Sequence, residues 1–285
     1  MGAEKKTNEI LYFALRNGKL KIGLVIVFIF VAIAIFGPLF SKYPLNEFVA
    51  GGPNPPSADY FMGTTAYGQD VFAQFVYGLR STFIVGIVGG GIATMLGMLI
   101  GFLGGYKGGW LDEFLNGITN IILVIPTFAL LLIMVAYLKL RGVVLESIFI
   151  GLTCWPWAAR AIRAQTFSLV SREFVDLAKL SGMGTLKIIF GEIAPNMMSY
   201  LFMTFILQFG GAILNAATLD FIGLGPTQGA SLGLMMNWAT IGSALLLGYW
   251  WWFVPPGLAI TAIVGALYIM NVGLDEVFNP KLREM

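Results

Sequence analysis

The sequence predicts an all-α polytopic membrane protein, and three observations support that fold class. The 285 residues are 58% hydrophobic, with a mean hydropathy of +0.82. Only 11% of them are charged, against about 25% in soluble domains. Six stretches are apolar over about 20 residues, the length that lets a helix cross the hydrocarbon core. They are 22–40, 82–106, 114–138, 144–162, 196–219 and 253–274.

Composition also excludes several kinds of chemistry. The chain has no histidine and a single cysteine, Cys154. Histidine-based catalytic triads, imidazole metal sites, histidine proton relays and internal disulfides are therefore excluded. The net charge of +2 is too small to indicate a nucleic-acid surface. We expect no catalytic residues, no metal site and no nucleic-acid partner.

The N-terminal segment 1–21 is rich in lysine and has apolar residues near helical spacing. We expect it to lie along the inner leaflet as an interfacial helix; a solvated tail is the alternative. The span 22–40 is too long for a signal peptide and has no cleavage site, so it is predicted to stay in the protein as an anchor.

Orientation follows from the basic residues, which concentrate on the cytoplasmic side of a membrane protein. With the N-terminus inside, 13 of the 17 basic residues face the cytoplasm, and Lys42, Arg80, Lys139 and Arg141 face outward. Both termini are then cytoplasmic. The Pro-, Gly- and Asn-rich loop 41–80 is extracytoplasmic, and a five-helix core follows over 81–285. That core contains a cytoplasmic loop at 163–195 and an external loop at 220–252.

Three spans carry internal patterns. The second has glycines at mostly four-residue steps, for which packing inside the subunit is favoured over a subunit interface. Pro126 is predicted to kink the third. One face of the fifth is polar and is predicted to line a translocation path, with interhelical hydrogen bonds as the alternative. The glycines are Gly86, Gly90, Gly97, Gly101 and Gly105, and the polar face consists of Thr204, Gln208, Gly211 and Asn215.

The uncharged stretch 221–274 is too long for one span. Glycines and Pro226 interrupt its first half, which predicts a loop with short interfacial or re-entrant helices. We expect Trp250, Trp251 and Trp252 at the headgroup level, as in an aromatic belt. Pro255, Pro256 and Gly257 are then expected to open the last span.

An internal energy source is missing from the sequence. Acidic residues near the spans fall at their ends (Asp112, Glu113, Glu146, Asp220 and Asp275), which argues against a self-powered proton-coupled transporter. A phosphate-binding loop is also absent, because the only Gly-Lys pair, Gly18-Lys19, precedes Leu20 rather than Ser or Thr. Energy for active transport is therefore expected from another subunit.

The cytoplasmic stretch 171–195 predicts two short helices joined by a glycine turn. Ser171 is expected to cap the first helix and Thr185 the second. Phe174, Leu177, Ala178 and Ser181 share one helical face. Gly182 and Gly184 allow a tight reversal with positive φ, and Pro195 marks the return to the membrane. Such an amphipathic hairpin suits docking into a partner's groove.

This hairpin resembles the signature loop of ABC importer permeases, whose pattern is E-A-A-x-x-x-G followed by a proline 13 residues after the glycine. Asp176, Leu177, Ala178 and Gly182 occupy the E, A, A and G positions, and Pro195 has the required spacing. Asp replaces Glu, Leu replaces the first Ala, and the ending Ile193-Ala194-Pro195 is shifted by one position from the I-x-L-P of the pattern and lacks its Leu. Four further segments resemble the dipeptide, oligopeptide and nickel permeases, in particular their second, C-type permease. They are 63–70, 77–81, 221–225 and 271–280.

The resemblance covers nearly the whole chain and implies a type I ABC importer permease core. It implies a homologous second permease, two ATPase subunits that hold ATP and Mg²⁺, and an extracytoplasmic substrate-binding protein, in a prokaryotic plasma membrane. The expected cargo is a peptide or a similar solute such as an oligosaccharide. A stand-alone channel or facilitator is the alternative. The residues expected to couple to the ATPase are Glu173, Phe174, Asp176, Leu177, Ala178, Gly182, Met183 and Pro195.

Overall fold

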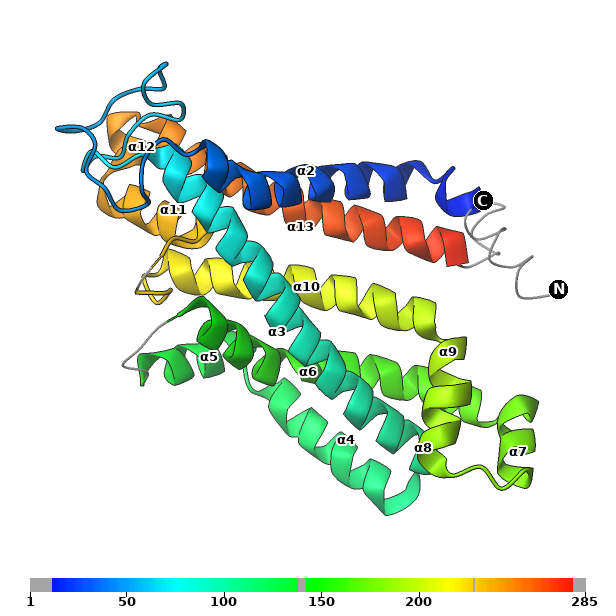
Figure 1. Ribbon diagram of the computed structural model, residues 1–285. Coiled ribbons are helices and arrows are strands. Elements are labelled where there is room, and N and C mark those ends of the chain that lie inside the picture. Colours follow the sequence, from blue (N-terminus) through cyan, green and yellow to red (C-terminus); the bar gives the residue numbers. More distant parts are fainter. Residues whose placement is uncertain (1–11, 138–141, 228, 279–285) are drawn as a thin grey trace.

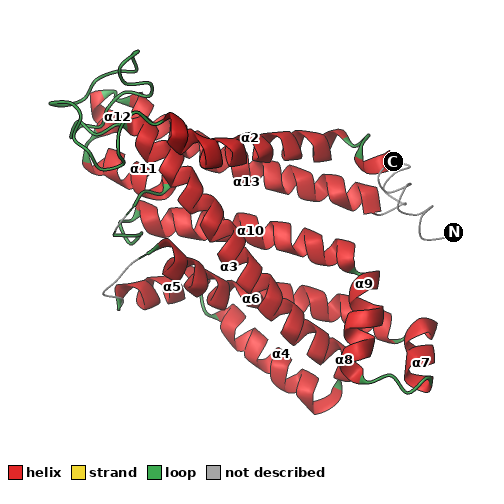
Figure 2. Ribbon diagram, in the orientation of Figure 1, coloured by secondary structure: helices red, strands yellow, loops and turns green. Residues whose placement is uncertain are grey.

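A computed structural model describes residues 12–137, 142–227 and 229–278, and these ranges are almost entirely helical (Figures 1 and 2). Helices predominate because a chain in lipid must satisfy its backbone hydrogen bonds within each segment. The longer helices are α2 (Gly18–Phe40), α3 (Val71–Lys107), α4 (Gly109–Val124), α6 (Val143–Val170), α10 (Met198–Phe221) and α13 (Trp250–Phe278). The shorter ones are α5 (Thr127–Ala136), α7 (Glu173–Leu180), α8 (Thr185–Ile188), η1 (Ile189–Ile193), α9 (Ala194–Asn196), α11 (Leu232–Ile241) and α12 (Ala244–Leu247).

The helices are compatible with the six predicted spans. Four described helices, α2, α3, α10 and α13, are long and apolar enough to cross a membrane, and α4 with α5 makes a fifth if the pair is one broken span. The predicted span 144–162 lies inside α6. At about 1.5 Å per residue the 28 residues of α6 extend about 42 Å. Glu146, Arg160 and Arg163 make α6 more polar than the four long apolar helices.

Proline breaks the third span, as the sequence predicts. Pro126 lies between α4 and α5, whose axes differ by 79°. The break is a change of direction rather than a gentle kink, because proline lacks the N–H that would continue the hydrogen-bond ladder of α4.

The glycine stripe of α3 allows close packing within the subunit. A Cβ at Gly97 would lie 2.6 Å from the Ala158 Cβ, and one at Gly101 would lie 2.8 Å from the Ala159 carbonyl oxygen, both on α6. A Cβ at Gly90 would lie 2.8 Å from the Phe209 Cα on α10. The packing interpretation is confirmed, because small residues let membrane helices approach at backbone distance.

The remaining spans complete the bundle on the other side of α10. There α10 contacts α13, and α13 pairs along its length with α2 (Figure 1). Two more glycines mark this close pair: a Cβ at Gly23 or at Gly273 would lie 2.6 Å from backbone atoms of the facing helix. Asn17 caps α2, accepting from the Leu20 N–H at 2.8 Å, and therefore starts the helix four residues before the predicted span.

At the opposite end from Gly18, the loop 41–70 covers α11, α12 and the start of α13 (Figure 1). Trp251 donates its indole N–H to the Thr64 carbonyl at 3.0 Å, and Trp252 is fully buried. Trp251 and Trp252 therefore pack inside the subunit, and of the three only Trp250 is exposed. Their level relative to the headgroups stays a prediction. Their burial fixes the first turn of α13, so that helix begins at Trp250 and includes Pro255 instead of starting there.

The predicted short helices of the external loop are confirmed as α11 and α12. Asp70 caps α3 by accepting from the Ala73 N–H at 2.8 Å, and burial raises the pKa of that carboxyl. Several predictions fall outside the described residues. They are the first half of the N-terminal segment (1–11), Lys139 and Arg141, and the closing Asn279-Pro280 pair.

Candidate functional site

The hairpin predicted at 171–195 is a compact helical projection at one end of the bundle. It consists of α7, α8, η1 and α9, and it lies at the same end as the start of α2 and the end of α13 (Figure 1). The two ends of the described bundle are thus distinct: one carries this hairpin, and the other carries loop 41–70 with α11 and α12.

The reversal of the hairpin depends on Gly182. Its φ is +75°, a left-handed conformation that L side chains rarely adopt. The Gly182 N–H donates to the Lys179 carbonyl at 3.0 Å and the Met183 N–H to the Ala178 carbonyl at 3.2 Å. These two bonds are those of a Schellman motif, which satisfies the last carbonyls of α7. The predicted glycine turn is confirmed at Gly182, whereas Gly184 has a φ of −68° and needs no special conformation.

The caps expected at the two short helices are wrong. Ser171 ends α6 and Arg172 precedes α7, without a side-chain hydrogen bond. Thr185 is the first residue inside α8, and Gly184 precedes it. The reason is that α6 extends to Val170, farther than its apolar run, so Ser171 is taken up in closing that helix.

Helix α7 has two apolar sides, which the sequence pattern did not separate. Val175 and Ala178 are buried, with Phe174 partly buried beside them. Leu177 and Leu180 point away, with exposed fractions of 64% and 85%. The prediction that Leu177 shares the buried face is therefore wrong. The buried side is centred on Val175 and Ala178, and Leu177 points to the opposite side.

The buried side of α7 joins the hairpin to the spanning helices. Val175 and Ala178 belong to a buried cluster with Phe102 of α3, Ile162 of α6 and Leu201 of α10; its other members are Ala158, Ile188, Ile189, Ile193, Ala194 and Met197. Protein interiors are closely packed and transmit displacement. Through this cluster, α7 is packed against three long helices.

The exposed side of the hairpin presents three leucines, Leu177, Leu180 and Leu186. Asp176, on the same helix as Leu177 and Leu180, pairs with Lys179 at 3.1 Å, and the two side chains are 60% and 43% exposed. A pair this exposed contributes at most about 1 kcal/mol to stability. Glu173, in the first turn of α7, is also exposed. The surface is thus an apolar patch with charged neighbours.

Pro195 lies where the hairpin turns back into the bundle. The preceding turn, η1, is a π-helix, and Pro195 is near the start of α9. Proline has no N–H for an α-helical bond, and its ring crowds the carbonyl four residues earlier, so a wider turn relieves both conflicts. α10 then begins at Met198.

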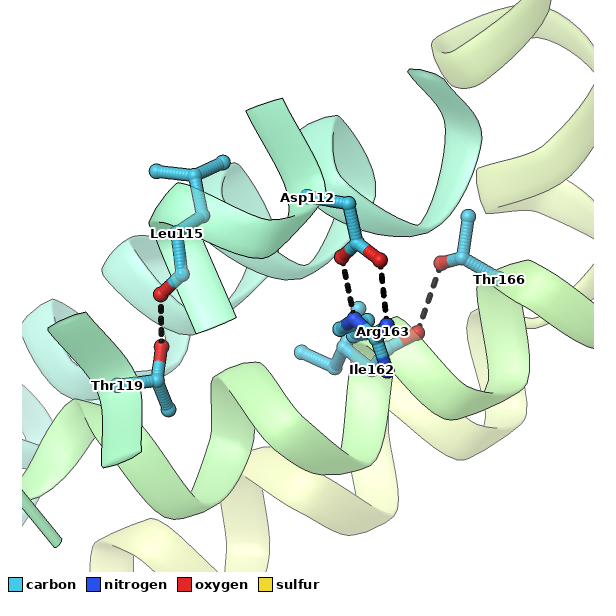
Figure 3. Close-up of polar contacts among 6 residues, drawn as sticks. All are labelled: Asp112, Leu115, Thr119, Ile162, Arg163 and Thr166. Carbon is cyan, nitrogen blue, oxygen red and sulfur yellow. Dashed lines mark hydrogen bonds and ion pairs between the residues drawn. The ribbon is translucent and has the colours of Figure 1, made fainter. Parts of the chain in front are cut away.

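An ion pair that the sequence did not reveal ties α4 to α6 near this end. The Arg163 guanidinium donates through Nε and Nη2 to the two oxygens of Asp112, each at 2.5 Å (Figure 3). The side chains are 32% and 15% exposed. Bidentate charge-assisted pairs are among the stronger polar contacts. The two residues are 51 positions apart, so no local pattern could have matched them.

The polar face of α10 turns partly into the subunit. The Gln208 amide donates to the Cys154 carbonyl of α6 at 2.8 Å, and Thr204 is buried and bonds to the Tyr200 carbonyl at 2.8 Å. Asn215 and Gly211 are only partly buried, and the Asn215 amide donates to the Gly211 carbonyl at 2.9 Å. The contacts of Gln208 are those of the interhelical alternative.

Two acidic residues predicted at span ends are in the expected turns but are not at the surface. Glu146 is in the first turn of α6 and Asp220 in the last turn of α10, with exposed fractions of 8% and 2%. The ends of these helices are covered by the segment that leads into α11, which the sequence pattern could not place.

Comparison with known proteins matches this sequence to one family. Residues 93–284 match the family described as binding-protein-dependent transport system inner membrane component. The chain belongs to this family. Residues 15–58 match the N-terminal transmembrane domain of oligopeptide transport permease C. The family match includes α6 to α10, and therefore the whole hairpin with Gly182.

Individual relatives extend the comparison over nearly the full chain. The oligopeptide transport system permease protein OppC of Bacillus subtilis is 30% identical over 273 residues, which are 94% of this chain and 88% of the relative. The dipeptide transport system permease protein DppC of the same species is 32% identical over 94% of this chain and 84% of its own length. The DppC protein of Alkalihalophilus pseudofirmus is 33% identical, with coverages of 94% and 88%.

Proposed function

We propose that this chain is a permease subunit of an ABC importer and forms half of a translocation pathway for peptides. The observation that carries the proposal is the hairpin: Leu177, Leu180 and Leu186 are exposed on it, while Val175 and Ala178 anchor it to α3, α6 and α10. An apolar patch that stands out from the bundle and is fixed to its helices suits coupling to an ATP-hydrolysing partner. The names of the relatives support peptides as cargo.

In this proposal the chain sits in a prokaryotic inner membrane with the hairpin end in the cytoplasm, the orientation that the basic residues indicate. A homologous second permease completes the pathway. Two ATPase subunits hold ATP and Mg²⁺ and receive the hairpins, and an extracytoplasmic binding protein delivers cargo to the end formed by loop 41–70, α11 and α12. The chain itself carries out no chemistry.

A leucine substitution at the tip tests the docking role. Leu180→Ser removes an apolar side chain that is 85% exposed, so it leaves the packing of the subunit unchanged. If Leu180 is buried by the ATPase, its loss removes about 1.5–3 kcal/mol, equivalent to roughly 10- to 150-fold weaker docking. We expect less ATPase subunit to co-purify and cargo-stimulated ATP hydrolysis to fall. Leu245→Ser is the matched control for co-purification of the ATPase, since Leu245 is 72% exposed on α12 at the other end.

A second variant tests the shape of the hairpin. Gly182→Leu places a side chain at a φ of +75°, which frays the end of α7, although no atom lies within 4 Å of the new Cβ. Gly184→Leu has the same open space without the positive φ. Membrane insertion of both should be normal, and only Gly182→Leu should lose coupled transport. Full coupling in both Leu180→Ser and Gly182→Leu would refute the proposal.

A further inference from the structure

Glu146 and Asp220 form a buried carboxyl pair at the opposite end from the hairpin. Their side chains line one small enclosed space, although they come from the first turn of α6 and the last turn of α10. One oxygen of each, Glu146 Oε1 and Asp220 Oδ1, is shielded from solvent and receives no donated hydrogen bond. Two ionised carboxylates offer only acceptors, so neither could donate a hydrogen bond to the unpartnered oxygen of the other.

The surroundings of the pair supply stabilisation for one negative charge. The Ser231 hydroxyl donates to Asp220 Oδ2, and Glu146 lies at the N-terminal end of α6, where the helix dipole favours an anion. The other described polar residues that line the space around the pair are Ser81 and Thr82 of α3. Among the described residues lining this space there is no lysine or arginine, and the Arg80 side chain is exposed.

There is little room for another group beside the carboxyls. The enclosed space is about 10 Å³, at most that of one water molecule. Backbone closes over the pair on one side, since a Cβ at Gly225 would lie 2.3 Å from Asp220 Oδ1. Within the described residues, no cluster of three or more acidic, cysteine or histidine side chains is present that could hold a metal ion.

We propose that Glu146 and Asp220 bind one proton between them. This proton holds α6 and α10 together at the end of the bundle opposite the hairpin. A single proton shared by the two groups would give both unpartnered oxygens, Glu146 Oε1 and Asp220 Oδ1, a hydrogen bond. Full ionisation would instead place two negative charges side by side away from water. Because Ser231 also caps α11, accepting from the Leu234 N–H at 3.0 Å, the proton links α6 and α10 to the segment that begins α11.

The proposal fixes the sign of a pH effect. The folded chain holds a proton that both carboxyls release near pH 4 when unfolded. Folding therefore takes up one proton at neutral pH, and stability falls as the pH rises. The limiting slope is about tenfold in the folding equilibrium constant per pH unit.

Infrared spectroscopy of the full-length protein in detergent tests the shared proton directly. A protonated carboxyl group has a carbonyl stretching band separate from the carboxylate bands, and this band shifts in heavy water. We expect the band at neutral pH in the wild type. It should be absent from Glu146→Gln, whose amide replaces the carboxylic acid as the donor to Asp220. Glu47→Gln, which changes an exposed carboxyl in loop 41–70, should retain it.

Thermal unfolding supplies an independent measurement. From about pH 6 to about pH 9 the wild-type midpoint should fall, and Glu146→Gln should lose most of that slope while remaining folded. The absence of both the protonated band and the pH slope from the wild type would overturn the proposal. So would a wild-type midpoint that rises with added Na⁺, K⁺ or Ca²⁺ and is insensitive to them in Glu146→Gln, because a bound cation would then hold two ionised carboxylates.

Discussion

The contact between α3 and α6 can be tested with a single methyl group. In Gly101→Ala the new Cβ would lie 2.8 Å from the Ala159 carbonyl oxygen and 2.9 Å from the Arg163 backbone nitrogen. Both are backbone atoms, so no side-chain rotation makes room, and the two helices must separate. Gly91→Ala, on the same helix, is the control because no atom lies within 4 Å of its Cβ position.

The size of the effect follows from these distances. An ordinary contact is 3.4–4 Å, so α3 and α6 must move apart by roughly half an ångström or more. Overpacking of this kind costs about 1–3 kcal/mol. Replacing glycine by alanine inside a helix adds about 1 kcal/mol of stability through helix propensity. Gly91→Ala gains the same amount, so this term cancels in the comparison. Gly101→Ala should therefore be about 1–3 kcal/mol less stable than Gly91→Ala.

Thermal unfolding of the two variants in detergent measures the difference. At about 2–4 °C per kcal/mol, the midpoint of Gly101→Ala should lie about 2–12 °C below that of Gly91→Ala. Equal midpoints, or a higher one for Gly101→Ala, would refute the close approach of the two helices at Gly101.

Three further outcomes are expected. Asp112→Asn should destabilise the protein by about 1–3 kcal/mol in the same unfolding assay. The reason is that Arg163 loses its charged partner while only a third of its side chain is exposed to water. A variant as stable as the wild type would contradict the ion pair. Trp251→Phe should leave the bundle folded but free the Thr64 carbonyl, and limited proteolysis should then cut loop 41–70 faster than in the wild type. In a chain whose Cys154 is replaced by alanine, Gly211→Cys should react with a polar thiol reagent during transport and Gln208→Cys should not, since Gly211 has open space around it and Gln208 contacts α6. The reverse order of reactivity would place the pathway along the edge of the polar face that is next to α6.

Much of this architecture could be predicted from local sequence. The length of the apolar stretches predicted the spans, and the spacing of the glycines in α3 indicated close packing. Gly182 indicated the turn of the hairpin. These features depend on backbone preferences and on periodicity within one helix, which a short segment carries by itself. The two short external helices were predictable for the same reason, since glycines and prolines interrupt an otherwise apolar run.

Other features depended on which segments meet. Sequence reasoning assigned Trp251 and Trp252 to the headgroup level, and only loop 41–70 explains their burial. It also assigned Leu177 to the same face as Ala178, although a shift of one position in the anchored helix exposes it.

By itself, the sequence determined that the chain is built of apolar helices that cross a membrane and that a helical hairpin lies at 171–195. Composition, charge bias and helical spacing are properties of contiguous residues. Only the tertiary structure decided which polar side chains meet: Asp112 and Arg163, Gln208 and the Cys154 carbonyl, and Glu146 and Asp220, which line one enclosed space. The partners in each pair are 51 or more residues apart. Their meeting depends on how whole helices pack, and no local pattern encodes that.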